Sequence, residues 1–281
     1  MRPKLSRARC QEIETRVLPL GGTTDVVGVR LETGRSGYAP GGIWMRAAVG
    51  EGLLYMGDHS REPILYAFDT PPEARTIIID ASYGTDDTPF AERLKKFEPL
   101  FGLPELLLPV PADGRGPEIA LYVSRKDSSV LRIDDAVRSA LHGLAATDRA
   151  SLHGGIATEI ARIAETAGAI DGPRGVMLAS RADAMAGEAA RLVGLWENAR
   201  DPAIVFTGYV PVGTPAERLI RIGRARCLRW NVHPRLSDNA ALVRATRAKT
   251  VIPTFCEPGD LAEVARALAP AQVTIDMPVT L

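Results

Sequence analysis

Short apolar runs rich in Val, Ile and Leu alternate along the chain with longer stretches that carry apolar or alanine residues at helical spacing. The short runs are typical of buried β-strands, and the longer stretches, which mostly begin after Ser or Asp, are typical of helices. This alternation predicts an α/β fold. The expected strands are residues 25–31, 43–49, 52–56, 76–79, 105–110, 175–179, 203–207, 227–230 and 250–254. The expected helices are residues 90–101, 115–124, 134–145, 151–167, 183–199, 237–248 and 260–268, and the polar residues 126–135 are expected to form a surface connection.

Two of the apolar runs end on a carboxylate. L-L-Y-M-G-D-H-S turns at Gly57 and presents Asp58, and T-I-I-I-D ends at Asp80. Ligands of open α/β sheets bind at the carboxyl ends of the strands, so the two aspartates are candidates for one site. The alternative is that each aspartate caps the turn that follows it, as Asp commonly does.

Composition narrows the class of protein. The 281 residues include 34 basic and 34 acidic side chains, so net charge argues neither for nor against a polyanionic partner. Cys10, Cys227 and Cys256 are isolated, which favours a reducing compartment over a disulfide framework. There is no run of about 18 apolar residues, and no apolar segment follows the basic N-terminus. These features predict a soluble, cytoplasmic protein without membrane contact.

Five segments resemble those of one family. Y-M-G-D-H-S-R-E and I-I-I-D-A-S-Y-G are similar to segments of metallo-β-lactamase-fold proteins with a β-CASP insertion, a group that includes bacterial ribonuclease J and the endonuclease of mRNA 3′-end processing. Three further segments resemble this family in the same order, and the likeness extends over residues 31–255. They are L-L-L-P-V-P-A-D-G-R-G-P-E-I-A-L (106–121), A-I-V-F-T-G-Y-V-P-V-G-T (203–214) and W-N-V-H-P-R-L-S-D (230–238).

The resemblance implies an architecture and a chemistry. A partial metallo-β-lactamase αββα domain, made of residues 1–86 and 222–281, would be interrupted by an α/β β-CASP insertion over residues 87–221. The family hydrolyses phosphodiesters, usually of RNA, with hydroxide bound to zinc. In this family Asp58 matches the aspartate that bridges two metal ions. Asp80 matches the acid that orients catalytic groups, and His233 matches a histidine near the scissile phosphate.

The zinc-binding residues of the family are largely absent. The motif H-x-H-x-D-H does not occur, since no two of His59, His142, His153 and His233 have its spacing. Tyr38 replaces a ligand histidine, and a phenol with a pKa of about 10 is a poor zinc ligand at neutral pH. Near the last ligand position only Cys256 offers a zinc ligand, as a thiolate. We therefore expect no zinc to be bound by this chain alone, with Asp58 a vestigial ligand. His59 should point away from Asp58, to the opposite face.

Several residues are candidates for binding a phosphate or RNA. Gly114 and Arg115 open an expected helix whose amides and guanidinium suit a phosphate, although a tight turn with a solvated arginine is an equal alternative. Further candidates for the same cleft are Gly208, Gly213, Thr214 and Asn231, and the glycines could instead simply form turns. The stretch from position 218 to position 249 contains nine basic residues and a single acidic residue, Asp238. This excess fits a single-stranded RNA track or a solvated helix face. Few aromatic residues are interleaved, so base stacking is not expected.

The sequence is compatible with three functions. The leading hypothesis is a non-catalytic nucleic-acid-binding subunit that pairs as a homodimer or with an intact relative, because half of a sandwich leaves an apolar sheet face uncovered. The second is a metal-dependent RNA exonuclease or endonuclease truncated at its N-terminus. The third is a small-molecule hydrolase with a rebuilt one-metal site, since the lactamase fold carries many chemistries.

Overall fold

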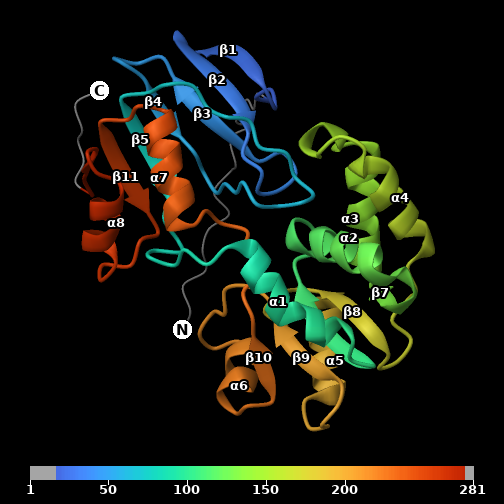
Figure 1. Ribbon diagram of the computed structural model, residues 1–281. Helices are drawn as coiled ribbons and strands as arrows, with labels where there is room; N and C mark the ends of the chain where they lie inside the picture. Colours follow the sequence, from blue (N-terminus) through green and yellow to red (C-terminus); the bar gives the residue numbers. More distant parts are fainter. Residues whose placement is uncertain (1–16, 276–281) are drawn as a thin grey trace, which may run out of the picture.

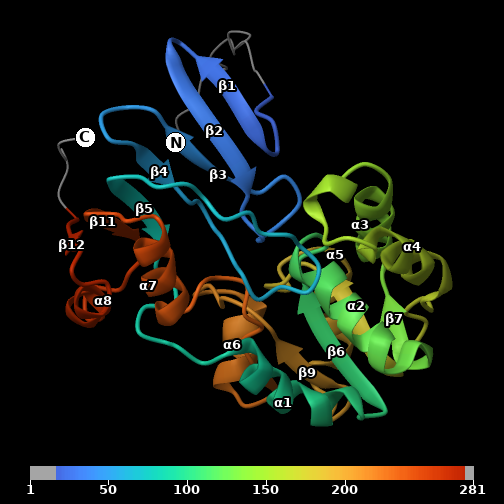
Figure 2. The ribbon, with the colours of Figure 1, turned by 45° about the horizontal axis from the view of Figure 1, so that its top comes forward.

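Two β-sheets organise the computed structural model, which describes residues 17–275 (Figures 1 and 2). The first sheet is mixed, with the strand order β1-β2-β3-β4-β5-β11-β12, and its strands β4, β5, β11 and β12 are parallel. Its strands are β1 Gly22–Val26, β2 Val29–Arg35, β3 Ile43–Ala47, β4 Leu53–Tyr55, β5 Thr76–Asp80, β11 Thr250–Thr254 and β12 Gln272–Val273. The α/β prediction is thus confirmed.

The second sheet is entirely parallel, with the strand order β10-β9-β6-β8-β7. Its strands are β6 Glu105–Val110, β7 Leu131–Ile133, β8 Gly175–Ser180, β9 Ala203–Phe206 and β10 Ala225–Cys227. The chain leaves the first sheet after β5, builds the whole second sheet, and returns to the first sheet at β11. The last strand of this second sheet, β10, ends at Cys227, and the domain boundary at Arg221 stays a prediction.

Helices cover both faces of the second sheet and one face of the first. Both faces of β6 are apolar, so each face needs a layer of helices. Leu106 and Leu108 pack with α2, α3 and α4 on one face, and Leu107 packs with α5 and α6 on the other. On the first sheet, Ile77 and Val251 pack against α7 and α8 (Figure 1). The helices are α1 Phe90–Phe101, α2 Arg115–Asp127, α3 Asp135–Ala146, α4 Ile156–Thr166, α5 Gly187–Trp196, α6 Pro215–Arg221, α7 Leu236–Ala245 and α8 Leu261–Ala267.

On the other face of the first sheet, one residue from each of five neighbouring strands lies beside the next. These residues are Thr33, Met45, Tyr55, Ile78 and Ile252. Of these, only Tyr55 is strongly exposed, at 43%, while Met45, Ile78 and Ile252 are half-buried. The apolar face that the resemblance led us to expect is therefore only partly open. Association through it, as a homodimer or with an intact relative, stays a prediction.

Local structure departs from the sequence predictions at three places. The expected strand at residues 25–31 is a hairpin, because Val27 and Gly28 both adopt positive φ angles, of 49° and 78°, and turn the chain. The expected surface connection at 126–135 contains β7, whose Leu131 and Ile133 are each only 1% exposed. The expected strand at 227–230 lies earlier, as β10, where Ala225 pairs with β9.

The chain crosses between the two sheets twice, after β5 and before α7, and a polar network joins the two crossing segments. Asp86 accepts hydrogen bonds from Arg93 and Arg229. Asn231 receives the Nε–H of Arg93 and donates to Glu62. These contacts connect the segment after β5 with the segment before α7, and so link the two units. Among the residues that the structure describes, no helix has the length and apolar character needed to cross a bilayer.

Candidate functional site

A cleft of about 840 Å³ lies between the carboxyl edges of the two sheets. The first sheet contributes Tyr38 after β2, Tyr83 after β5 and Phe255 after β11. The second sheet contributes Arg115 after β6 and Gly208 after β9. In the second sheet the chain moves from β6 to β7 and β8 on one side and to β9 on the other, so Arg115 and Gly208 flank the switch point at which open α/β sheets bind ligands.

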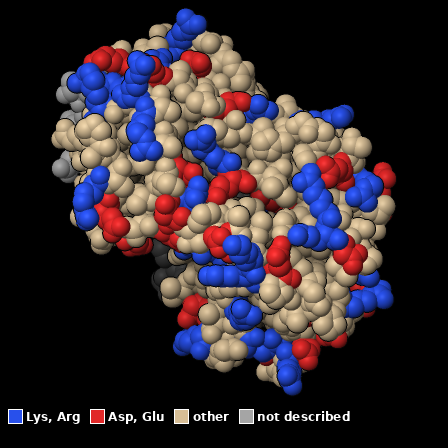
Figure 3. Space-filling view, in the orientation of Figure 1, with Lys and Arg blue, Asp and Glu red and all other residues tan. Residues whose placement is uncertain are grey.

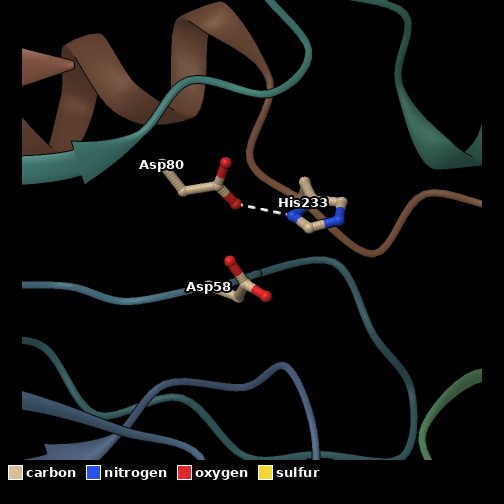
Figure 4. A group of neighbouring side chains, drawn as sticks. All are labelled: Asp58, Asp80 and His233. Atoms are coloured by element: carbon tan, nitrogen blue, oxygen red, sulfur yellow. Dashed lines mark hydrogen bonds and ion pairs between the residues drawn. The ribbon is translucent and has the colours of Figure 1, made fainter. Parts of the chain in front are cut away.

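Asp80 and His233 form a hydrogen-bonded pair beside this cleft (Figure 4). The Nδ1 of His233 lies 2.6 Å from Oδ2 of Asp80, and the other carboxylate oxygen accepts the backbone N–H of Ser82 at 2.9 Å. Burial acts to raise the pKa of Asp80, but the hydrogen bonds from His233 and Ser82 outweigh it and hold that pKa below its usual value. The carboxylate is thus ionised and can only accept, so Nδ1 donates and Nε2 is left as the basic nitrogen.

Asp58 completes a group of three with this pair. The turn at Gly57, with a φ of 55°, directs its carboxylate toward the space between Asp80 and His233 (Figure 4). One potential ligand atom from each of the three residues lies within 4.8 Å of the others. Burial raises the pKa of Asp58, and the neighbouring Asp80 adds to the rise, while His233 opposes it. The arrangement brings together the three residues that the sequence marked as catalytic.

Two tyrosine rings flank the imidazole of His233. The ring centroid of Tyr38 lies 5.2 Å from that of His233, and the centroid of Tyr83 lies 5.4 Å from it in an edge-on arrangement. The hydroxyl of Tyr83 accepts the backbone N–H of Val232 at 3.1 Å, so this ring supports the loop that carries His233. Tyr38 has no such backbone contact and lines the cleft. Its pKa is raised by burial and by the Asp58 carboxylate.

Arg115 is a cation without a protein partner at the start of α2. It makes no hydrogen bond or ion pair with any described residue, and its Nε is fully buried. Burial lowers its pKa. The guanidinium lies against the backbone of Gly208, where a Cβ atom would come within 2.3 Å of Nη2. An unpaired, partly desolvated cation at a helix N-terminus is suited to bind an anion.

Charge is divided between the two sides of the cleft. Arg115 and Arg229 lie on the side of the second sheet, and Arg229 also stacks 4.4 Å above the Tyr83 ring and pairs with Asp86. Glu257 and Asp260 line the side of the first sheet. An anionic group is therefore expected to lie close to Arg115.

Two aromatic residues at this cleft were not foreseen as binding residues from the sequence. Tyr209 is 85% exposed and Phe255 is 71% exposed, although both line the cleft. Phe255 also adopts a φ of 59°, a strained conformation for a bulky residue, and such strain is often found at functional sites. The two rings come from separate loops and not from the basic segment to which the expectation of no base stacking referred, and that expectation stays a prediction.

Three further candidate binding residues, Gly114, Gly213 and Thr214, form helix caps and turns. Gly114 caps α2 with a φ of 63° and its carbonyl accepts the hydroxyl of Tyr66 at 3.2 Å. Thr214 caps α6 by accepting the N–H of Glu217, and Gly213, with a φ of 81°, forms the preceding turn. Neither Gly213 nor Thr214 lines the cleft.

Asn231 was expected to contact substrate. It is 1% exposed, and its side chain is already hydrogen-bonded to Arg93, Glu62 and the carbonyl of Thr88. Because no side-chain group of Asn231 is left for a ligand, the structure gives it the role of linking the two units.

Two further residues concern the metal prediction. Cys256 packs against the core of the first unit, and its thiol is hydrogen-bonded to the carbonyl of Glu257, so it is not part of the group formed by Asp58, Asp80 and His233. His59 is 1% exposed and does not belong to that group either. Burial lowers the pKa of His59 to about 4, so it is a neutral histidine.

The basic residues at positions 218–249 do not form one track. Acidic partners from other parts of the chain neutralise several of them: Arg218 pairs with Glu197, and Arg247 pairs with Glu73. Of the nine, only Arg229 lines the cleft. On the face shown in Figure 3, basic and acidic side chains are interspersed.

The donor set does not fit the two-zinc centre that the resemblance implies. Zinc sites commonly take four ligands each, mostly from His and Cys. The described residues offer one group, with two carboxylates and one imidazole, which has donors for a single cation.

Comparison of the chain with protein-family models and with curated proteins finds no match. The likeness to the metallo-β-lactamase and β-CASP family therefore remains an interpretation of the sequence motifs.

Proposed function

We propose that this chain binds single-stranded RNA in the cleft between its two sheets, as a divergent metallo-β-lactamase-like protein with a β-CASP insertion. Two observations support the family. The five sequence segments occur in the family order, and the second sheet is inserted between β5 and β11 of the first. The two-zinc hydrolytic centre is not part of the proposal, because the donor set does not fit it.

The observation that carries the proposal is the unpaired Arg115. A partly buried cation that pairs with no carboxylate by a hydrogen bond is costly, and a phosphate oxygen would supply the missing acceptor. The N-terminal amides of α2 add donors at the same place, since α2 begins at Arg115. Gly208 supports this position of the guanidinium, because a Cβ atom there would come within 2.3 Å of Nη2 and would force Arg115 to move.

A strand fits this cleft better than a small anion. The volume of about 840 Å³ is near the upper end of small-molecule sites. Tyr209 and Phe255 present exposed rings on which bases can stack, and stacking tolerates any base sequence. Tyr209 also borders a second pocket of about 370 Å³, which contains Arg181. Pro111 and Tyr209 line both pockets, so an extended ligand such as a strand can contact Tyr209 while it occupies both.

Fluorescence anisotropy tests the proposal directly. A labelled RNA of about 12 nucleotides lies within the site sizes of single-strand-binding proteins. We expect it to bind, with an affinity that falls steeply between about 50 and 200 mM salt. The same sequence as a perfect duplex should bind more weakly, because its bases cannot reach Tyr209 and Phe255. Equal binding of duplex and single strand would contradict the proposal.

One alternative is favoured by a specific observation. The proximity of Asp58, Asp80 and His233 gives donors for a single cation, as the small-molecule hydrolase hypothesis requires. Calorimetric titration with Mn²⁺ and with Zn²⁺ tests it. Stoichiometric binding that is lost in Asp58→Asn would favour this alternative, whereas the proposed RNA-binding function predicts no requirement for either metal.

A further inference from the structure

We propose that this cleft also cleaves the RNA it binds, by attack of the 2′-hydroxyl on the adjacent phosphate, with His233 as general base and Tyr38 as general acid. The inference rests on the proposed RNA binding. It concerns a reaction that takes its nucleophile from the RNA itself, so neither bound water nor a two-metal centre is needed. Three features of the cleft support it.

The first feature is an oriented imidazole. Asp80 is completely buried, whereas 21% of the His233 side chain is exposed, next to the cleft. The hydrogen bond of 2.6 Å between them fixes the ring, and Figure 4 shows that its second nitrogen faces away from Asp80. A buried carboxylate that holds a histidine in one tautomer is the arrangement by which a histidine is made a directed base. Asp80 is thus a positioning residue.

The second feature is a proton donor close to that base. The ring of Tyr38 lies 5.2 Å from the ring of His233 and on the cleft wall. Burial and the Asp58 carboxylate raise the pKa of Tyr38, so its hydroxyl is protonated at neutral pH. This phenol is still more acidic than the alcohol that forms when the leaving alkoxide takes its proton. The tyrosine at the position of a family zinc ligand is therefore a functional group in this cleft and not merely a lost ligand.

The third feature is the charge near the reacting phosphate. Attack by the 2′-oxygen places an additional negative charge on the phosphoryl oxygens. The unpaired Arg115 guanidinium can stabilise this charge in a partly desolvated position, and Arg229 lies on the same side of the cleft. Removal of an oriented donor of this kind costs on the order of 10²-fold or more in rate.

The reaction balances without a further reactant. The O2′–H bond breaks and its proton passes to Nε2 of His233, while the O2′–P bond forms. The P–O5′ bond breaks and the leaving oxygen takes the phenolic proton of Tyr38. The products are a 2′,3′-cyclic phosphate and a free 5′-hydroxyl. His233 loses its proton and Tyr38 regains one by exchange with water, so both return to their starting states, and no group is oxidised or reduced.

The decisive experiment compares two substrates in the presence of EDTA. One is an end-labelled single-stranded RNA, and the other is the same strand with 2′-O-methyl groups, which can be bound but cannot react. We expect the RNA to be cut to fragments that end in a 2′,3′-cyclic phosphate, identified by mass spectrometry, and the methylated strand to stay intact. Binding of the methylated strand is measured separately by anisotropy.

Protein variants identify the catalytic groups. His233→Gln and Tyr38→Phe should each lower the cleavage rate on the order of 10²-fold or more, with binding of the methylated strand changed less than about threefold. Tyr55→Phe is the matched control, because Tyr55 is exposed on the first sheet and does not line the cleft. It should cleave like the parent protein. His233→Gln, purified by the same procedure as the parent protein, also controls for a contaminating ribonuclease.

The outcomes separate the inference from the function on which it rests. Binding of the methylated strand without cleavage of RNA would overturn the inference and leave the RNA-binding function standing. Cleavage that EDTA abolishes, or that also cuts DNA, would overturn it in favour of metal-dependent hydrolysis. Absence of binding would overturn both.

Discussion

Asp80 and His233 are 153 residues apart in the chain, yet Oδ2 of Asp80 lies 2.6 Å from Nδ1 of His233. The contact exists because the chain leaves the first sheet at the end of β5, completes the second unit, and returns past the same edge before α7. An interruption of one unit by another therefore brings a strand end and a distant loop into one acid–base pair. Its function can be tested by changing only the carboxylate.

Asp80→Asn should lower the rate of metal-free RNA cleavage by about 10²-fold to 10⁴-fold. The amide can donate to Nδ1, which favours the tautomer whose proton is on Nε2, so the base toward the cleft is lost. Binding of the methylated strand should be nearly unchanged. Single-turnover rates at saturating protein measure the effect, and a rate equal to that of the parent protein would show that Asp80 does not orient the base.

Arg115→Ala should weaken RNA binding by about 1–3 kcal/mol, because it removes a charge-assisted contact that is partly shielded from water. The slope of log affinity against log salt should fall by about 1, as expected for the loss of one phosphate contact. Arg174→Ala is the control, since Arg174 is exposed and pairs locally with Asp171. An unchanged slope in Arg115→Ala would mean that the guanidinium contacts no phosphate.

Tyr209→Ala and Phe255→Ala should each weaken single-strand binding by about 1–3 kcal/mol, the range for loss of one stacked base. The salt slope should stay as in the parent protein, because no charge is removed. Leu195→Ala serves as control, since Leu195 is 61% exposed and does not line the cleft. If both aromatic variants bind RNA like this control, then stacking plays no part in recognition.

Asp58→Asn should leave RNA binding in EDTA unchanged or slightly stronger. The carboxylate lies near Asp80 and His233, beside the cleft, so its removal takes away a negative charge that would repel a bound phosphate. Anisotropy titrations with and without added Mn²⁺ measure this. A large loss of affinity in EDTA would show that Asp58 supports RNA directly, and a loss seen only with Mn²⁺ would point to a bridging cation.

Local patterns predicted much of the fold. Strands 105–110 and 250–254 and helix 90–101 have the limits expected, because each is a strong apolar or amphipathic run with clear ends. The hairpin at Val27 was missed because its turn contains a β-branched residue at positive φ, which sequence rules disfavour. The strand β7 was missed because it is short and flanked by polar residues.

The candidate site was predicted where it depends on strand ends and motifs, as for Asp58 and Asp80. It was not predicted where tertiary structure decides. The exposure of Tyr209 and Phe255 depends on how two loops from different sheets face each other. The pairing of Arg218 with Glu197 likewise depends on the packing of α6 beside α5, and no count of charges along the sequence contains it.

A buried acid lies one helical turn from Arg115 and allows the packing around α2 to be tested without RNA. Glu118 is 1% exposed and accepts the backbone N–H of Ile64 at 3.1 Å. Burial raises its pKa to about 7 from 4.5, against the opposing effects of the Ile64 hydrogen bond and the Arg115 charge. The unfolded chain ionises at the lower pH, so this group lowers the stability of the folded protein as pH rises from about 4.5 to about 7.

Glu118→Gln should remove this pH dependence, because the amide keeps an acceptor for Ile64 but does not ionise. Between pH 5 and pH 8 the free energy of unfolding of the parent protein should fall by about 2–3 kcal/mol more than that of the variant. Urea unfolding at the two pH values measures the double difference, so any constant effect of the amide cancels. Glu165→Gln, at an exposed position on α4, is the control and should keep the parent pH dependence. Parallel pH profiles of the parent protein and Glu118→Gln would show that the pKa of Glu118 is not raised in the folded protein.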